Sequence, residues 1–264
     1  MKVAAIQMIS GTDLAANLLS ARRLLTEAAE QGAEFLLLPE YWPLMGQHDT
    51  DKLAIAEASG HGVMQAFLAD MAKSLGVWIV GGTIPLLSDE SGKVLNSSLV
   101  FRPDGQQLAR YDKIHLFGFN KGDESYEEAR TITPGNQITT FDTGFGKVGM
   151  AICYDLRFPE MFRAMGDCAL LLLPAAFTYT TGQAHWEILL RARAIENQCY
   201  VLACGQGGLH QNGRRTWGHS MLIDPWGNIM AELAEGEGIV AGELDMSLLA
   251  SIRASLPALQ HRKL

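Results

Sequence analysis

The chain has 264 residues, of which 21 are basic and 29 acidic, so its formal net charge is −8, and it contains no run of lysines or arginines. This balance argues against a nucleic-acid partner and against binding to an anionic membrane surface. The hydrophobic share of 48% and the charged share of 19% are typical of a globular protein, and the length fits a single domain over residues 1–264.

Two features of the sequence predict a cytoplasmic protein without membrane segments. The apolar stretch at residues 1–7 is too short for a signal peptide, and the longest apolar run, residues 169–177, is interrupted by Pro174. The cysteines show no C-x-x-C spacing, which argues against a zinc site, and a cytoplasmic compartment argues against disulfides. The four cysteines are Cys153, Cys168, Cys199 and Cys204.

The first half of the chain alternates between the apolar periods of strands and helices. Between residues 14 and 28 the apolar positions follow at steps of four, three, four and three, which gives one helix face, and Gly32 is a natural stop. The sequence Arg-Pro-Asp-Gly at residues 102–105 is a strong hairpin-turn signal. The predicted elements are strands over 3–8, 35–38, 77–80, 97–101 and 107–111, with helices over 14–28 and 64–75.

The second half repeats this order. Its predicted elements are strands over 148–153, 169–173, 200–204, 220–224 and 239–244, with helices over 158–165 and 185–197. The fragment Leu-Leu-Leu-Pro occurs at residues 36–39 and again at 171–174, which indicates two β-α-β halves related by weak internal symmetry. Chance similarity of two buried Leu-rich strands is the alternative. Alternating strands and helices predict the α/β class, in which sites gather at the carboxyl ends of strands.

Cys153 is the candidate nucleophile. It ends the apolar run at residues 148–152, and polar and helix-starting residues follow it. This pattern predicts a thiol presented at a sheet edge, with the backbone N–H of Tyr154 placed to hold an oxyanion. A buried structural cysteine is the alternative for a lone thiol.

Glu40 and Lys113 follow other predicted strands and supply what a reactive thiol needs. A thiol attacks a carbonyl as its thiolate, and Glu40 can take the proton. Lys113 can stabilise the thiolate and the oxygen of a tetrahedral intermediate. Taken singly, the non-catalytic interpretation is favoured for each: Glu40 as a buried ion-pair partner, and Lys113 as a surface residue on a hairpin. His115 raises the possibility of a Cys–His pair, but no protease signature surrounds Cys153.

In their flanking motifs these three residues resemble the nitrilase, or carbon–nitrogen hydrolase, superfamily. The matching pieces are Leu-Pro-Glu at 38–40, Tyr-Asp-Lys-Ile-His-Leu at 111–116 and Gly-Met-Ala-Ile-Cys-Tyr-Asp-Leu-Arg-Phe-Pro-Glu at 149–160. The resemblance implies a four-layer α-β-β-α sandwich that pairs into homodimers. It also implies that Cys153 is the nucleophile, Glu40 the general base and Lys113 the group that holds the intermediate. A further catalytic glutamate matches Glu128, with Glu127 as a competitor and a solvated loop glutamate as the alternative for both.

Four further stretches resemble the deaminated-glutathione amidase branch. They are residues 184–200, 218–220, 223–227 and 256–262. This resemblance implies cleavage of deaminated glutathione into α-ketoglutarate and cysteinylglycine through a thioester, with no metal or organic cofactor. An ω-amidase acting on α-ketoglutaramate, a nitrilase or other amidase of the superfamily, and a non-catalytic binding protein are the alternatives. The intact set of Glu40, Lys113 and Cys153 argues against the last.

The implied substrate is a small anionic amide, so an acidic protein must offer local positive charge. Arg157, four residues after the nucleophile, is the first candidate because an arginine fork matches a carboxylate. Arg191 and Arg193 are weaker candidates, for which a structural role is favoured. Thr181, in a predicted loop over 178–181, either shapes substrate choice or belongs to an ordinary polar loop. The polar, glycine-bearing segment 118–130 is a candidate lid.

Overall fold

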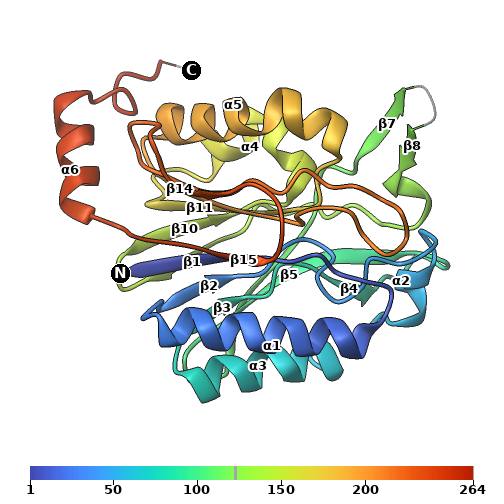
Figure 1. The fold of residues 1–264 in the computed structure, drawn as a ribbon. Coiled ribbons are helices and arrows are strands. Elements are labelled where there is room, and N and C mark those ends of the chain that lie inside the picture. The colour runs from blue at the N-terminus through green and yellow to red at the C-terminus, as the bar shows by residue number, and fades with distance from the viewer. Residues whose placement is uncertain (122–123, 264) are drawn as a thin grey trace.

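In the computed structural model, which describes residues 1–121 and 124–263, two β-sheets stack face to face between two layers of helices (Figure 1). The first sheet has the strand order β15-β1-β2-β3-β5-β4, with β6 beside β5, and the second has the order β14-β13-β12-β11-β10-β9. Helices α1 and α3 cover the first sheet, and α4 and α5 cover the second (Figure 1). The predicted four-layer α/β architecture is therefore confirmed.

The elements have the following bounds. The first sheet contains β1 (Lys2–Gln7), β2 (Phe35–Leu37), β3 (Trp78–Val80), β4 (Ile84–Leu87), β5 (Val94–Phe101), β6 (Gln107–Asp112) and β15 (Gly238–Glu243). The second contains β9 (Thr140–Thr143), β10 (Gly146–Met150), β11 (Leu170–Ala175), β12 (Tyr200–Gly205), β13 (Ser220–Ile223) and β14 (Ile229–Leu233). The helices are α1 (Leu14–Glu30), α2 (Asp51–Ala54), α3 (Val63–Leu75), α4 (Pro159–Ala164), α5 (Tyr179–Asn197) and α6 (Met246–Ser255). The short 3-10 helices are η1 (Glu128–Arg130) and η2 (Cys153–Arg157), and β7 (Gly118–Lys121) pairs with β8 (Glu124–Glu127).

The two halves share one plan, as the repeated Leu-Leu-Leu-Pro fragment predicts. Strands β1, β2 and β3 are parallel and alternate with helices, and so are β10, β11 and β12. The repeated fragments begin in β2 and β11, which are the middle strands of these two units. The internal symmetry is thus a feature of the fold.

The continuous apolar strands of the first sheet are explained by burial on both faces. Along β1, Val3 and Ala5 belong to the core between the two sheets, whereas Ala4 and Ile6 belong to the core beneath α1 and α3. Successive side chains of a strand point to opposite faces, so a strand covered on both sides must be apolar at every position. Within the described residues, no helix is long and apolar enough to cross a membrane.

Three sequence predictions near the site were wrong in their local structure. The strand that leads to the nucleophile ends at Met150, and Cys153 instead opens η2. The predicted loop over 178–181 contains the N-cap of α5, Thr178, and its first helical turn. Segment 118–130 is largely a β-hairpin followed by η1, and residues 122–123 lie outside the described chain. Strands β4, β9 and β14 and helix α6 were not predicted.

Candidate active site

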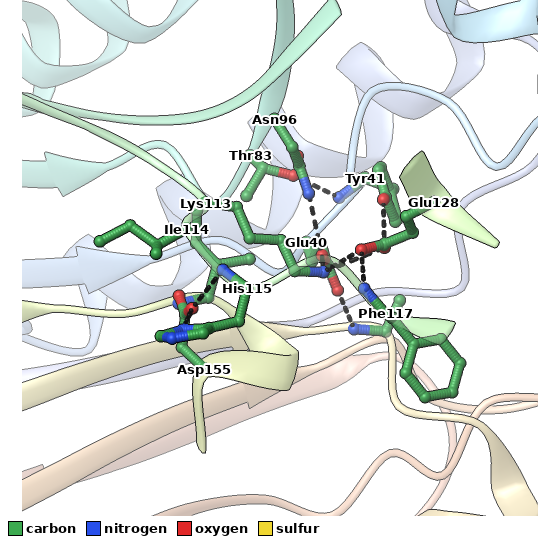
Figure 2. Close-up of polar contacts among 12 residues, drawn as sticks. Glu40, Tyr41, Thr83, Asn96, Lys113, Ile114, His115, Phe117, Glu128 and Asp155 are labelled. Carbon is green, nitrogen blue, oxygen red and sulfur yellow. Dashed lines mark hydrogen bonds and ion pairs between the residues drawn. The ribbon is translucent and has the colours of Figure 1, made fainter. Parts of the chain in front are cut away.

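Glu40 lies just beyond the end of β2 and is 1% exposed. Its Oε1 accepts hydrogen bonds from Lys113 Nζ and from Asn96 Nδ2, both at 2.9 Å (Figure 2). Its Oε2 accepts a hydrogen bond from the backbone N–H of Ala176 at 2.8 Å. Three donors from different segments thus fix one carboxylate in place at the end of the sheet.

Lys113, fully buried after β6, bridges two carboxylates. Its Nζ lies 2.9 Å from Glu40 Oε1 and 2.8 Å from Glu128 Oε2 (Figure 2). Glu128 is held in turn by the Tyr41 hydroxyl and the Phe117 N–H, each at 2.7 Å. The structure therefore brings Glu128 into the predicted cluster.

Its neighbour Glu127 is excluded from the cluster. Glu127 pairs instead with Arg130 at 2.6 Å, and both side chains are exposed. The sequence left open which glutamate belongs to the site, and the geometry selects Glu128.

The charges in this cluster stabilise one another. Burial alone would lower the pKa of Lys113, but Glu128 and Glu40 more than offset it and raise that pKa well above its usual range. Burial opposes ionisation of Glu128 as well, yet the Lys113 ammonium and the hydrogen bonds lower the pKa of Glu128. At neutral pH the cluster therefore holds one ammonium between two carboxylates, with an excess of one negative charge.

Cys153 lies against this excess charge and is 6% exposed. Burial and the Glu40 carboxylate raise the pKa of the Cys153 thiol well above its usual range, with Lys113 acting in the opposite direction. The resting thiol is thus protonated, and a hydrogen bond links it to Glu40. Such a thiol needs a base to become a nucleophile, and the adjacent Glu40 carboxylate can accept the proton.

The backbone is left-handed on both sides of the site. Cys153 has φ 49° and Tyr41, next to Glu40, has φ 55°. L-residues with side chains rarely adopt this conformation, and it costs roughly 1–3 kcal/mol where it occurs. Both strained residues lie at the points where the chain turns out of a sheet into the site.

A second buried carboxylate, Asp155, holds the nucleophile turn. Its Oδ2 accepts from the Tyr111 hydroxyl at 2.7 Å and from the Ile152 N–H at 2.8 Å. Its Oδ1 accepts from the His115 N–H at 3.1 Å, and His115 Nδ1 lies 2.7 Å away (Figure 2). His115 therefore faces Asp155 and stacks on Phe158 with ring centres 3.7 Å apart, so a Cys–His pair finds no support in the geometry.

A small cavity opens beside the thiol and receives two of the predicted substrate-binding residues. Tyr154 and Thr181 both line it, together with Phe177. Thr181 is 7% exposed, and its hydroxyl lies 2.8 Å from that of Thr178, the N-cap of α5. Thr181 thus combines a capping contact with a place on the cavity wall.

The predicted arginines fall into two groups. Arg157 packs on the rings of Tyr154 and Phe177, at 5.7 and 5.5 Å, behind the cavity wall. Arg191 pairs with Glu187 at 3.0 Å, and the buried Arg193 donates to the carbonyl of Leu156. The structural roles favoured for Arg191 and Arg193 are therefore confirmed. Of the three, Arg157 alone lies beside residues that line the cavity.

Sequence reasoning missed Asn96, Tyr41 and Asp155. Asn96 and Asp155 are each 2% exposed or less. The available signal was weak: each polar residue adjoins an apolar strand pattern, and buried polar groups need partners. The partners themselves come from distant segments, which the sequence does not pair.

Known proteins are similar to this chain in sequence and in fold. The family model for carbon-nitrogen hydrolases matches residues 2–254. A deaminated glutathione amidase from Synechocystis sp. (strain PCC 6803 / GT-S) is 42% identical over 265 residues, covering 98% of this chain and 97% of the relative. Omega-amidase NIT2 from Mus musculus is 37% identical, covering 99% of this chain and 95% of the relative.

A solved structure agrees with these similarities. The crystal structure of Saccharomyces cerevisiae Nit3, a member of branch 10 of the nitrilase superfamily, superposes with a TM-score of 0.89 at 33% identity, covering 100% of this chain and 97% of that one. Family match, sequence identity and fold therefore coincide over nearly the whole length. The chain belongs to the carbon–nitrogen hydrolase family, and its reaction is the hydrolysis of a carbon–nitrogen bond.

Proposed function

We propose that the protein hydrolyses a small anionic amide with Cys153 as nucleophile and Glu40 as general base. The observation that carries this proposal is the contact of one buried thiol with a carboxylate that a lysine and a backbone N–H hold in place. Lys113 and the backbone N–H of Tyr154 stabilise the developing oxyanion, and Glu128 orients Lys113. The contacts of Lys113 with Glu40 and Glu128 support the roles of these side chains, and Tyr154 lines the cavity beside the thiol.

The acylation step moves one proton and exchanges one bond. Glu40 takes the thiol proton of Cys153 while Sγ bonds to the amide carbon, whose oxygen becomes an oxyanion. The intermediate collapses, the carbon–nitrogen bond breaks, and Glu40 returns the proton to the departing amine. Sγ then carries the acyl group as a thioester.

Water completes the cycle. Glu40 accepts a proton from water as the oxygen attacks the thioester carbon. The carbon–sulfur bond breaks, the carboxylic acid leaves, and Glu40 returns the proton to Cys153. The proton in both halves of this cycle is carried by Glu40.

For the substrate we propose deaminated glutathione, cleaved to α-ketoglutarate and cysteinylglycine. The support is the 42% identity, over 98% of this chain, to a relative named for that amide. The second candidate is α-ketoglutaramate, supported by the 37% identity to an omega-amidase. Both substrates carry the same acyl half and differ only in the leaving group, which makes them a matched pair.

The test is product release from both amides by the wild type, Cys153→Ala and Cys168→Ala. Cys168 is a buried cysteine that the mechanism does not use, so it controls for loss of a thiol as such. We expect Cys153→Ala to lose at least about 10⁴-fold in kcat, as nucleophile knockouts typically do, and Cys168→Ala to stay near wild type. Preference for α-ketoglutaramate would reassign the substrate, and an active Cys153→Ala variant would overturn the mechanism.

We also propose that the protein is a cytoplasmic homodimer. Ile188 and Ile195, seven residues apart on α5, are 69% and 51% exposed, and the exposed Trp226 follows in a neighbouring turn. Apolar side chains grouped on one face are typical of surfaces that bind a partner. Light scattering that gives the mass of one chain at micromolar concentration would contradict the dimer.

A further inference from the structure

A second, larger cavity adjoins the catalytic cluster. Its volume is about 350 Å³. It shares Tyr41, Phe117, Glu128 and Arg214 with the small cavity beside Cys153, so the two cavities adjoin at these residues. We call the larger space the Lys52–Arg214 cavity after two basic residues of its wall.

Arg214 is a cation without an anionic partner. Its Nε is buried and has no hydrogen-bond partner in the part of the chain that the structure describes. Its Nη1 lies 3.9 Å from Met45 Sδ, and its guanidinium lies 5.1 Å from the centre of the Tyr126 ring. Across residues 1–121 and 124–263, no carboxylate comes within 4.0 Å of it. A buried donor left unpaired is unfavourable, and a bound ligand that accepts a hydrogen bond from it would satisfy it.

Lys52 adds a second positive charge to the same wall. Its Nζ donates to the Thr131 hydroxyl at 3.1 Å and lies 5.4 Å from the centre of the Tyr41 ring. Burial lowers the pKa of Lys52, and the charge of Arg214 acts in the same direction. An anion bound between Lys52 and Arg214 would relieve both effects.

The acidic residues of the wall offset the charge of this pair only in part. Glu128 is engaged by Lys113 at 2.8 Å and Glu127 by Arg130 at 2.6 Å. Glu128 and the third acid, the exposed Asp49, both act to raise the pKa of Lys52. Among the described residues, however, no carboxylate forms an ion pair with Lys52 or Arg214, since Glu128 is paired with Lys113.

The backbone that carries Arg214 is held by hydrogen bonds. Arg214 ends a turn in which the His210 N–H donates to the Arg214 carbonyl at 2.8 Å and the Arg214 N–H donates to Asn212 Oδ1 at 2.9 Å. Asn212 Nδ2 anchors the turn to the Gly46 carbonyl at 2.6 Å. His210 is itself buried, with Nε2 2.8 Å from the Thr216 hydroxyl. Because the backbone that carries the guanidinium is already ordered, binding of an anion costs little backbone conformational entropy.

We propose that Arg214, assisted by Lys52, binds a carboxylate of the substrate and so determines specificity for anionic amides. This inference rests on the proposed function only in taking the substrate to be an anionic amide. A planar guanidinium fork matches a carboxylate, and Arg214 lines both this cavity and the one beside the reacting thiol. The carboxylate comes either from the α-keto acid half or from the carboxyl end of the cysteinylglycine leaving group.

The test compares Arg214→Gln, Lys52→Gln and the control Arg215→Gln. Arg215 is the adjacent arginine, but it pairs with Glu235 at 2.8 Å on the surface. The substrates are deaminated glutathione, α-ketoglutaramate and the neutral amide propionamide. We expect KM for the anionic amides to rise about 10- to 100-fold in Arg214→Gln, as for loss of a charged hydrogen bond, and less in Lys52→Gln. Turnover of propionamide should stay within about twofold, and Arg215→Gln should match the wild type.

Comparison of the two anionic substrates identifies which substrate carboxylate Arg214 binds. A defect confined to deaminated glutathione assigns the leaving-group carboxylate, and a defect with both amides assigns that of the α-keto acid. An equal loss with propionamide, together with a shifted pH profile, would overturn the proposal, because the two cations would then only balance the charge of the catalytic cluster. No change in Arg214→Gln would overturn it as well.

A second readout does not depend on turnover. Glutarate, a dicarboxylate probe, should protect Cys153 from alkylation by iodoacetamide in the wild type and in Arg215→Gln. Protection should need about 10-fold more glutarate in Arg214→Gln, and Arg214→Lys, which keeps the charge but not the fork, should recover part of it. If the wild type does not cleave deaminated glutathione, the proposed substrate fails while this readout still decides the carboxylate site. If the same glutarate concentration protected Cys153 in all variants, the proposed carboxylate site at Arg214 would be overturned.

Discussion

The two Leu-Leu-Leu-Pro segments begin in equivalent strands, β2 and β11, but contribute differently to the site. The first leads into Glu40, a charged group that the proposed reaction uses, whereas the second leads into Ala176, whose N–H donates to Glu40 at 2.8 Å. At the nucleophile the donors come from the first unit and the carboxylate from the second. Asp155 of the second unit accepts from Tyr111 and from His115, which belong to the first.

The same arrangement of parallel strands and helices thus occurs twice, and its two copies contribute different groups to the site. The first unit, with its hairpin strands, supplies Glu40, Lys113 and Glu128, and the second supplies Cys153 and its turn. Each unit fixes a carboxylate of the other, so the reactive geometry exists only when the two sheets stack. Changes to these two carboxylates should separate chemistry from positioning.

The largest effect is expected for Glu40→Gln. The amide keeps the shape but cannot accept the thiol proton, so turnover should fall by about 10²- to 10⁴-fold. The reactivity of the thiol should change in the opposite direction. The Glu40 charge raises the pKa of Cys153, so its removal should lower that pKa and move the midpoint of iodoacetamide alkylation to lower pH.

Turnover and alkylation are both measured on wild type and Glu40→Gln across pH. Asn96→Ala, which removes one donor to Glu40 but keeps the carboxylate, is the matched control. An alkylation midpoint that moves to higher pH in Glu40→Gln would show that Glu40 stabilises the thiolate, contrary to its proposed role.

A smaller effect, of about 10²-fold in kcat, is expected for Asp155→Asn. The asparagine presents an NH₂ group toward N–H donors that now point at a carboxylate, so the nucleophile turn must shift. Misplacement of a reacting group by about 1 Å can cost this much. The change should leave the pH midpoint of alkylation close to wild type, because Glu40 and Lys113 remain. A midpoint shifted as far as in Glu40→Gln would instead make Asp155 part of the proton chemistry.

The sequence predicts the reactive residues of the site but not the contacts that hold them. Glu40, Lys113 and Cys153 follow apolar strands at positions where chemistry gathers, and their motifs resemble a known superfamily. The parallel strand frame could be predicted for the same reason, since strands buried on both faces leave continuous apolar runs. Local backbone geometry could not be predicted in the same way: Cys153 is held in a left-handed turn by Asp155, a contact set by Tyr111 and His115 about forty residues away.

The choice between Glu127 and Glu128 depended on the same kind of distant contact. Both glutamates occupy one polar segment, and nothing in their spacing separates them. Tyr41, from the other end of the first unit, reaches Glu128 and leaves Glu127 to Arg130. Arg214 was missed because an arginine in a turn carries no signal until the cavity beside it is seen.

The smallest effect is expected for Tyr111→Phe, which removes one of the donors to Asp155 and keeps the ring in the core. Asp155 retains the Ile152 N–H and His115, so the turn should stay in place and kcat should fall by less than about fivefold. Loss of one buried hydrogen bond to a carboxylate should lower the free energy of unfolding by about 1.5–3 kcal/mol, measured by urea denaturation. The two variants should therefore differ in kind: stability falls while turnover persists in Tyr111→Phe, and turnover collapses in Asp155→Asn. A loss of turnover in Tyr111→Phe as large as in Asp155→Asn would mean that the hydroxyl, and not the carboxylate, holds the nucleophile turn across the two sheets.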